Sequence, residues 1–149
     1  MFWEEKIDLI AKKHGPDGFK NPFTAWPEIL KNIEDKFIIR TYDSNWEDNV
    51  KQKEELAIIE IKELNTLLSS LPDKNYWLVM MMGDYPTAKR LIYDCNIAAL
   101  KDLISLSKYD FYIVDKKYNW LTYFKCGTEK ITLYKSGITN SPFDIRASG

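Results

Sequence analysis

The chain offers few side chains that could bind a metal or attack a substrate. His14 is its only histidine, and Cys95 and Cys126 are its only cysteines. A structural zinc site needs four ligands at short, regular spacings, such as a C-x-x-C pair with histidines, and these residues do not supply it. The sequence therefore predicts a protein without a bound metal or cofactor.

Two cysteine-based arrangements remain open as a route to catalysis. Cys95 precedes a predicted helix, whose N-terminus would stabilise a thiolate, and Cys126 ends a predicted strand. Either thiol could act as a nucleophile only if folding placed it beside His14. The competing explanation is that both cysteines are small buried hydrophobic residues, and that His14 suits a helix C-terminus.

No pair of carboxylates stands out for acid–base catalysis. Four aspartates lie beside predicted turns or strand ends, where aspartate is expected for its hydrogen bonds to the backbone: Asp84, Asp94, Asp110 and Asp115. The six glycines are scattered, and the chain has no P-loop, dinucleotide fingerprint or G-x-S-x-G motif. We predict that the protein is not an enzyme; a small enzyme with an unrecognised carboxylate or cysteine site is the alternative.

Composition indicates one soluble domain spanning residues 1–149, with a loose tail from about residue 138. Hydrophobic residues make up 45% of the chain and the net charge is −1, which gives no overall attraction to polyanions. The longest nearly apolar run, 76–83, is too short to cross a bilayer, and the acidic N-terminus differs from a signal peptide. Two distant cysteines fit reduced thiols, so we expect a cytoplasmic protein without membrane partners.

The first half of the chain is predicted to be helical. Apolar spacing predicts a helix over 2–13, ended by HGPDG, and a second helix that begins at Pro27, with a short β-prone stretch at 37–42. Ser44 and Glu47 match a capping box, and a stripe of apolar residues over 57–71 predicts a third helix. A strand through LAIIEI is the competing interpretation, which the unbroken stripe disfavours.

The second half is predicted to be mostly strand. Segments 75–82 and 88–95 form an antiparallel pair joined by GDYPT, and Asn96 caps a helix. Three further strands form a meander of hairpins: DFYIV, NWLTYF and KITLY. The predicted fold is α+β, with N-terminal helices followed by a β-β-α-β-β-β unit. Its antiparallel sheet has about five strands, with the helices on one face.

Two surfaces could bind a partner. The meander interleaves aromatic residues with Lys116, Lys117, Lys125 and Lys130, which would suit nucleic acid, but lysines at turns also protect strand edges. The segment 43–63 carries seven acids around a tryptophan, as expected of a hot spot for a basic protein, or of a solvated helix face. The candidate partner-binding residues are Asp43, Trp46, Glu47, Asp48, Glu54 and Glu55.

The stretch DFYIVDKKYNWLTYF, residues 110–124, resembles the C-terminal β-hairpins of small bacterial immunity proteins, with the SUKH-type superfamily the nearest named group. The resemblance implies an α+β fold, no catalysis, and tight binding of a cognate toxin domain. We therefore expect a non-catalytic protein-binding domain, with a basic protein as its partner. Nucleic-acid binding by the meander is a further alternative, and the sequence predicts no oligomeric state.

The first testable expectation concerns metals and thiols. With one histidine and two isolated cysteines, the purified protein should contain no stoichiometric transition metal and no disulfide. Elemental analysis and intact mass under non-reducing conditions measure both. One zinc or iron per chain, or a mass lower by two hydrogens, would contradict the expectation.

Overall fold

The computed structural model describes residues 2–22, 24–39, 46–82 and 89–143. Within these ranges the strands form one antiparallel sheet of seven strands in the order β1-β4-β3-β5-β6-β7-β2. The strands are β1 (Phe19–Lys20), β2 (Lys53–Glu60), β3 (Tyr76–Met82), β4 (Lys89–Cys95), β5 (Phe111–Asp115), β6 (Leu121–Cys126) and β7 (Lys130–Ser136). The helices are α1 (Trp3–Gly18), α2 (Trp26–Phe37), α3 (Leu64–Ser69), α4 (Ile97–Ser105) and the 3-10 turn η1 (Ile61–Glu63).

The α+β class, the N-terminal helices and the β-β-α-β-β-β order from β3 to β7 are confirmed. The sheet is larger than expected, because β1 pairs with β4 at one end and β2 pairs with β7 at the other. Asn96 caps α4 as predicted, and its side chain accepts a hydrogen bond from the backbone N–H of Ala99 at 2.8 Å. The GDYPT turn lies outside the described residues.

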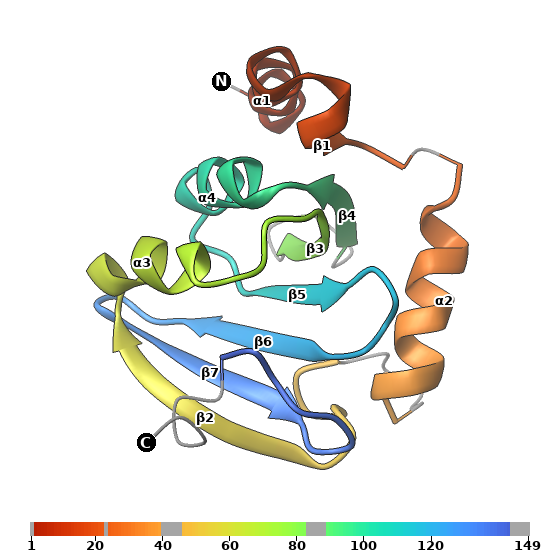
Figure 1. The fold of residues 1–149 in the computed structure, drawn as a ribbon, viewed down its shortest axis with the longest axis vertical. Helices are drawn as coiled ribbons and strands as arrows, with labels where there is room; N and C mark the ends of the chain where they lie inside the picture. The colour runs from red at the N-terminus through yellow and green to blue at the C-terminus, as the bar shows by residue number, and fades with distance from the viewer. Residues whose placement is uncertain (1, 23, 40–45, 83–88, 144–149) are drawn as a thin grey trace.

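Helices cover both faces of the sheet, which corrects the expectation of one covered face. Apolar residues of α1, α3 and α4 pack against one face, together with Leu78 and Met80 of β3. On the other face α2 packs with Val79 of β3 and with Trp46. Figure 1 shows α1, α3 and α4 grouped together, with α2 apart from them.

The predicted third helix is wrong over most of its length. Residues Lys53–Glu60 form β2, and only Leu64–Ser69 are α-helical, so the rejected strand interpretation of LAIIEI is correct. The β-branched residues of this segment favour a strand, and pairing with β7 outweighs the helical stripe. A capping box does form, at Glu60 and Glu63 of η1, whereas Ser44 lies outside the described residues.

The two ends of the described chain also differ from expectation. Within α1, Gly15 has φ 71°, a left-handed conformation that glycine adopts at little cost, so the HGPDG sequence kinks the helix there. Ile38 forms a single antiparallel bridge with Val50 in place of a strand over 37–42, whose last three residues are not described. Within the tail expected from residue 138, Phe143 is buried against Trp120 and Phe124, and residues 144–149 lie outside the described residues.

Trp46 gives a test of the core that lies between α2 and the sheet. Trp46→Ala should lower the free energy of unfolding by about 3–5 kcal/mol, because it leaves a cavity beside Tyr112. Trp26→Ala is the matched control, since that side chain is 47% exposed and its loss should cost about 0.5 kcal/mol. Urea unfolding of both variants measures the difference, and equal losses would contradict this account of the core.

Candidate protein-binding edge

Trp46 does not lie on the surface, so its predicted role as an exposed anchor is wrong. The side chain is 1% exposed, and its ring meets Tyr112 edge-on with the centroids 5.2 Å apart. Tyr112 belongs to a row of stacked tyrosines that crosses β5, β6 and β7, formed with Tyr123 and Tyr134. The apolar surface of this row explains why a tryptophan from an acidic segment is buried.

Lysine side chains neutralise part of the acidic segment. Glu47 forms an ion pair with Lys125 at 2.8 Å, and Lys53 donates to the backbone carbonyl of Glu47 at 2.8 Å. The hydrogen bond from Lys125 holds the pKa of the Glu47 carboxyl below its usual value; partial burial acts in the opposite direction, and the charge of Lys125 adds to the lowering. Lys53 also lies over the Tyr134 ring, 4.4 Å from its centroid. Glu47 therefore fastens the segment to β6.

The remaining predicted residues divide between an exposed turn and β2. Asp48 is exposed in the turn after Trp46, and Asp43 lies outside the described residues. Glu54 and Glu55 are exposed side chains of β2, and Glu54 lies 3.7 Å from Lys135 of β7. The structure therefore separates the predicted set and leaves only its β2 members on an accessible strand.

β2 is the last strand of the sheet, and among the described residues no strand pairs with its outer side. The Ile61 N–H donates to the Glu129 carbonyl at 3.1 Å. This bond shows which residues of β2 direct their backbone N–H and C=O groups towards β7. In an antiparallel pair the bonding alternates by residue, so Ile59 and Ala57 direct their backbone groups to β7. Ile58 and Glu60 accordingly direct theirs away from the sheet.

The exposed side chains of β2 and of the residues just after it are both apolar and acidic. Ile58 is 56% exposed and Ile61, just beyond the strand, is 44% exposed. Four glutamates and two lysines lie between residues 53 and 63, and Lys53 is turned onto the tyrosine row. A bulge between Glu55 and Ala57 interrupts the pairing register with β7 and limits the regular open edge to residues 57–61. We call residues 57–61 the β2 edge.

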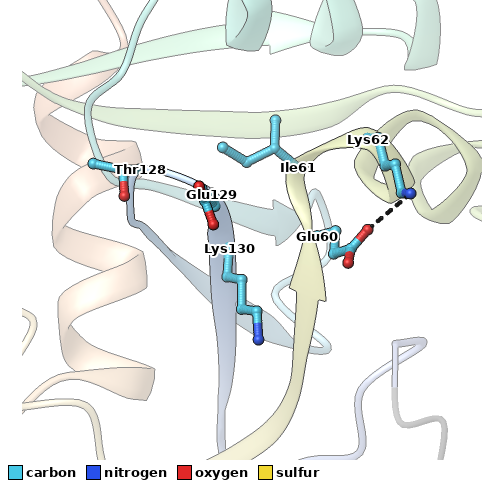
Figure 2. Close-up of a pocket in the computed structure, with 6 residues that line it drawn as sticks. All are labelled: Glu60, Ile61, Lys62, Thr128, Glu129 and Lys130. Carbon is cyan, nitrogen blue, oxygen red and sulfur yellow. Dashed lines mark ion pairs between the residues drawn. The ribbon is translucent and has the colours of Figure 1, made fainter.

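A cleft of about 360 Å³ lies at the end of the β2 edge (Figure 2). The β2–η1 junction supplies one wall, where Lys62 forms an ion pair with Glu60 at 3.1 Å, and the turn between β6 and β7 supplies the other. The lining residues are Glu60, Ile61, Lys62, Thr128, Glu129 and Lys130. The edge and the cleft are therefore continuous through Glu60 and Ile61.

The groups considered for catalysis are held in structural contacts. The Nε2 atom of His14 lies 2.6 Å from Asp102 of α4, which also pairs with Lys13 at 2.8 Å. Burial raises the pKa of the Cys126 thiol to about 12 and that of Cys95 well above its usual value. The expected stabilisation of a Cys95 thiolate by the following helix is therefore outweighed by burial. No metal-binding group of three acids, histidines or cysteines occurs among the described residues.

The meander also has a structural explanation. Its aromatic residues Phe111 and Phe124 stack on one face and the tyrosine row on the other, and both sets are largely covered. Asp115 accepts hydrogen bonds from the N–H groups of Lys117 and Asn119, so it orders the turn between β5 and β6 as predicted for a turn aspartate. Bases could not stack on side chains that already pack inside the protein.

Sequence reasoning missed the β2 edge because it assigned these residues to a helix. The available signal was the group of β-branched residues Ile58, Ile59 and Ile61. No helix within the described ranges combines the length and apolar composition needed to cross a membrane.

Fold and site together define an α+β domain with one antiparallel sheet that is covered on both faces and ends at β2, whose outer side pairs with no strand of the described residues. The chain belongs to a family of unknown function, DUF6756, which matches residues 12–140 and therefore the whole sheet. No curated protein and no solved structure matches the chain. Because the family description carries no activity, function must be argued from the site.

The Glu47 ion pair predicts a pH-dependent stability. A lowered folded-state pKa contributes stability above the ordinary glutamate pKa, and this contribution is lost as the pH falls through the folded value. Glu47→Gln should therefore lower the melting temperature at about pH 7 and have little effect at about pH 3. Glu55→Gln is the control. A Glu47→Gln loss of the same size at both pH values would exclude the ion pair as its cause.

Proposed function

We propose that this chain is a non-catalytic protein-binding domain that takes an extended segment of a basic partner onto the β2 edge. The observation that carries the proposal is an open strand edge with outward backbone groups at Ile58 and Glu60. An extended peptide can add to such an edge through main-chain hydrogen bonds, while side-chain contacts supply specificity.

Charge favours a basic partner segment. Glutamates stand before the β2 edge at Glu54 and Glu55 and within it at Glu60, while Lys53 is directed onto the tyrosine row. The exposed Ile58 and Ile61 supply apolar surface between these charges. A strand with an apolar centre and flanking lysines or arginines complements this arrangement, and its positive charge would speed association.

The resemblance of the meander to small bacterial immunity proteins supports a toxin domain as the partner. Such a partner would be bound and blocked, with no reaction carried out by this chain. The free thiols of Cys95 and Cys126 are compatible with a reducing compartment, and we propose that binding takes place in the cytoplasm.

A photo-crosslinking amino acid can identify the partner. Placed at Ile58 in the producing cell, it should capture one protein repeatedly, whereas the same group at Ile138 should not. Both side chains are exposed, and Ile138 lies beyond β7. Equal capture at the two positions would contradict binding at the β2 edge.

Ile58→Pro then tests strand addition with the captured partner. Proline removes an N–H that points away from β7, so the domain should stay folded while the partner loses a main-chain bond and meets the ring. Affinity should fall by about tenfold or more. Ile58→Thr, which keeps the N–H, is the matched control, and circular dichroism checks the fold. Unchanged affinity of a folded Ile58→Pro variant would exclude this binding mode.

Glu55→Lys tests the electrostatic part. Association should slow, and the effect should shrink as salt is raised, because exposed charges are screened. An effect independent of salt would argue against a basic partner.

A further inference from the structure

One of the outward backbone groups of the β2 edge is already bonded within the chain. The Glu60 N–H, which points away from β7, donates to Oε1 of the Glu63 carboxylate with an N···O distance of 3.4 Å. This contact is one half of the capping box of η1, and the Glu60 side chain accepts a hydrogen bond from the Glu63 N–H in return. The Glu63 carboxylate therefore lies on the outer side of β2, where an added strand would run.

The bond from Glu60 to this carboxylate is weak enough to exchange. Its length of 3.4 Å exceeds the about 2.7–3.2 Å usual for N–H···O bonds in proteins. The Ile61 N–H, on the inner side of the strand, makes a shorter bond to Glu129 at 3.1 Å. Glu63 is also an exposed residue, so its carboxylate has room to turn away. A partner carbonyl at ordinary distance makes a better acceptor for the Glu60 N–H once the carboxylate has moved.

The lysines around this end of the edge leave the charge of Glu63 unpaired. Two of them line the cleft, Lys62 and Lys130. Lys62 is taken by Glu60, with which it forms an ion pair at 3.1 Å (Figure 2). Lys130 and the remaining acid of the cleft, Glu129, lie on the β7 side of β2, away from the outward N–H. Within the described part of the chain, Glu63 forms no ion pair.

We propose that Glu63 is a specificity-determining residue of the β2 edge, whose carboxylate occupies the Glu60 N–H until a lysine or arginine of the partner segment draws it away. The inference rests on the proposed function, because it concerns strand addition at the same edge. The basic side chain pairs with Glu63, and a backbone carbonyl of the segment takes the freed N–H. An uncharged strand must displace the carboxylate with no new ion pair to compensate, so it binds less well.

This role distinguishes Glu63 from the glutamates of the strand itself. Glu55 is exposed and can attract a basic segment from a distance, but it bonds no outward backbone group of the edge. Glu63 couples recognition of charge to main-chain pairing. It also protects an edge that exposes Ile58 from pairing with any apolar strand, which natural proteins commonly prevent by placing charges at sheet edges.

Amide hydrogen exchange of the free protein tests the contact without a partner. Glu63→Ala should speed exchange of the Glu60 amide by about threefold or more, as expected for one lost hydrogen bond, and leave that of Ile59, which is directed to β7, unchanged. Glu63→Gln keeps a side-chain oxygen as acceptor and should retain the protection. Unchanged exchange at Glu60 in a folded Glu63→Ala variant overturns the proposal.

Two short synthetic peptides then test selection, one alternating valine with lysine and the other alternating valine with threonine. Glu63→Ala should raise the affinity for the threonine peptide by about threefold or more, because it frees the Glu60 N–H. It should not raise the affinity for the lysine peptide, which gains the same N–H but loses its ion pair. Glu63→Gln, which keeps the oxygen and removes the charge, should leave the threonine peptide weakly bound and lower the affinity for the lysine peptide.

Glu55→Ala is the matched control, since it removes an exposed glutamate that bonds no edge N–H and should leave the threonine peptide unaffected. Equal changes for both peptides in a folded Glu63→Ala variant would make Glu63 a helix cap only and overturn the proposal, as would the absence of peptide binding by every variant. Ile58→Pro separates this outcome from failure of the proposed function. Peptide binding that survives Ile58→Pro takes place away from the edge and contradicts both proposals. Binding that is lost in Ile58→Pro, with a lysine-to-threonine preference unchanged in Glu63→Ala, supports the edge and overturns the role of Glu63 alone.

Discussion

The central strands β3 and β5 are apolar on both faces, and most of the architecture follows from the need to cover both sides. Leu78 and Val79, adjacent on β3, are both fully buried and point to opposite cores. One face receives α1, α3 and α4. The other receives α2 and, beyond it, the segment that carries Trp46 onto the tyrosine row. Because this segment must cross the second face, the chain emerges beyond β7, where residues 53–60 pair as the last strand. The open edge is thus a consequence of core coverage.

The same constraint rearranges the acidic segment. Trp46 packs against Tyr112 in the core. The next residue, Glu47, lies at the edge of this core and forms an ion pair with Lys125. The glutamates that follow cannot enter the core and remain on the edge strand. A single acidic stretch is therefore divided into a structural part, before residue 53, and an accessible part after it. The exposed Glu55 in the accessible part retains charge that a partner could recognise.

The elements of the second half could be predicted because their signals are local. Three signals each specify an element without reference to distant residues. They are the run at β3 that is apolar on both faces, the helix cap at Asn96 and the turn at Asp115. In the first half, apolar spacing predicted α1 and α2 but not β2. Leu64, Leu68 and Leu71 are buried at helical spacing, and the stripe extends by coincidence into β2, whose partner β7 is remote in sequence. Coverage of both faces of the sheet also could not be predicted, because the sequence pattern does not show how much apolar surface the sheet must bury.

The candidate site was predictable only in its chemistry. Acidic residues around position 55 led to the hypothesis of a basic partner, which remains a prediction, and their exposure depends on strand pairing and not on spacing. Trp46 shows the converse, since a tryptophan among polar neighbours suggested exposure and is among the most buried side chains. The contact of His14 with Asp102 joins α1 to α4 across 88 residues of sequence and has no local signal.

The order of strands in the sheet also bears on how the chain folds. β1 pairs with β4, and β2 pairs with β7. Both outer strands therefore come from the first half of the chain, and their partners are synthesised much later. The meander β5-β6-β7 contains only neighbouring hairpins and pays little loop-closure entropy. Folding should therefore start from the C-terminal half and add the outer strands last. During synthesis, the isoleucines of β2 leave the ribosome well before β7 exists to receive them. In that interval the charged residues around them are the main protection against aggregation.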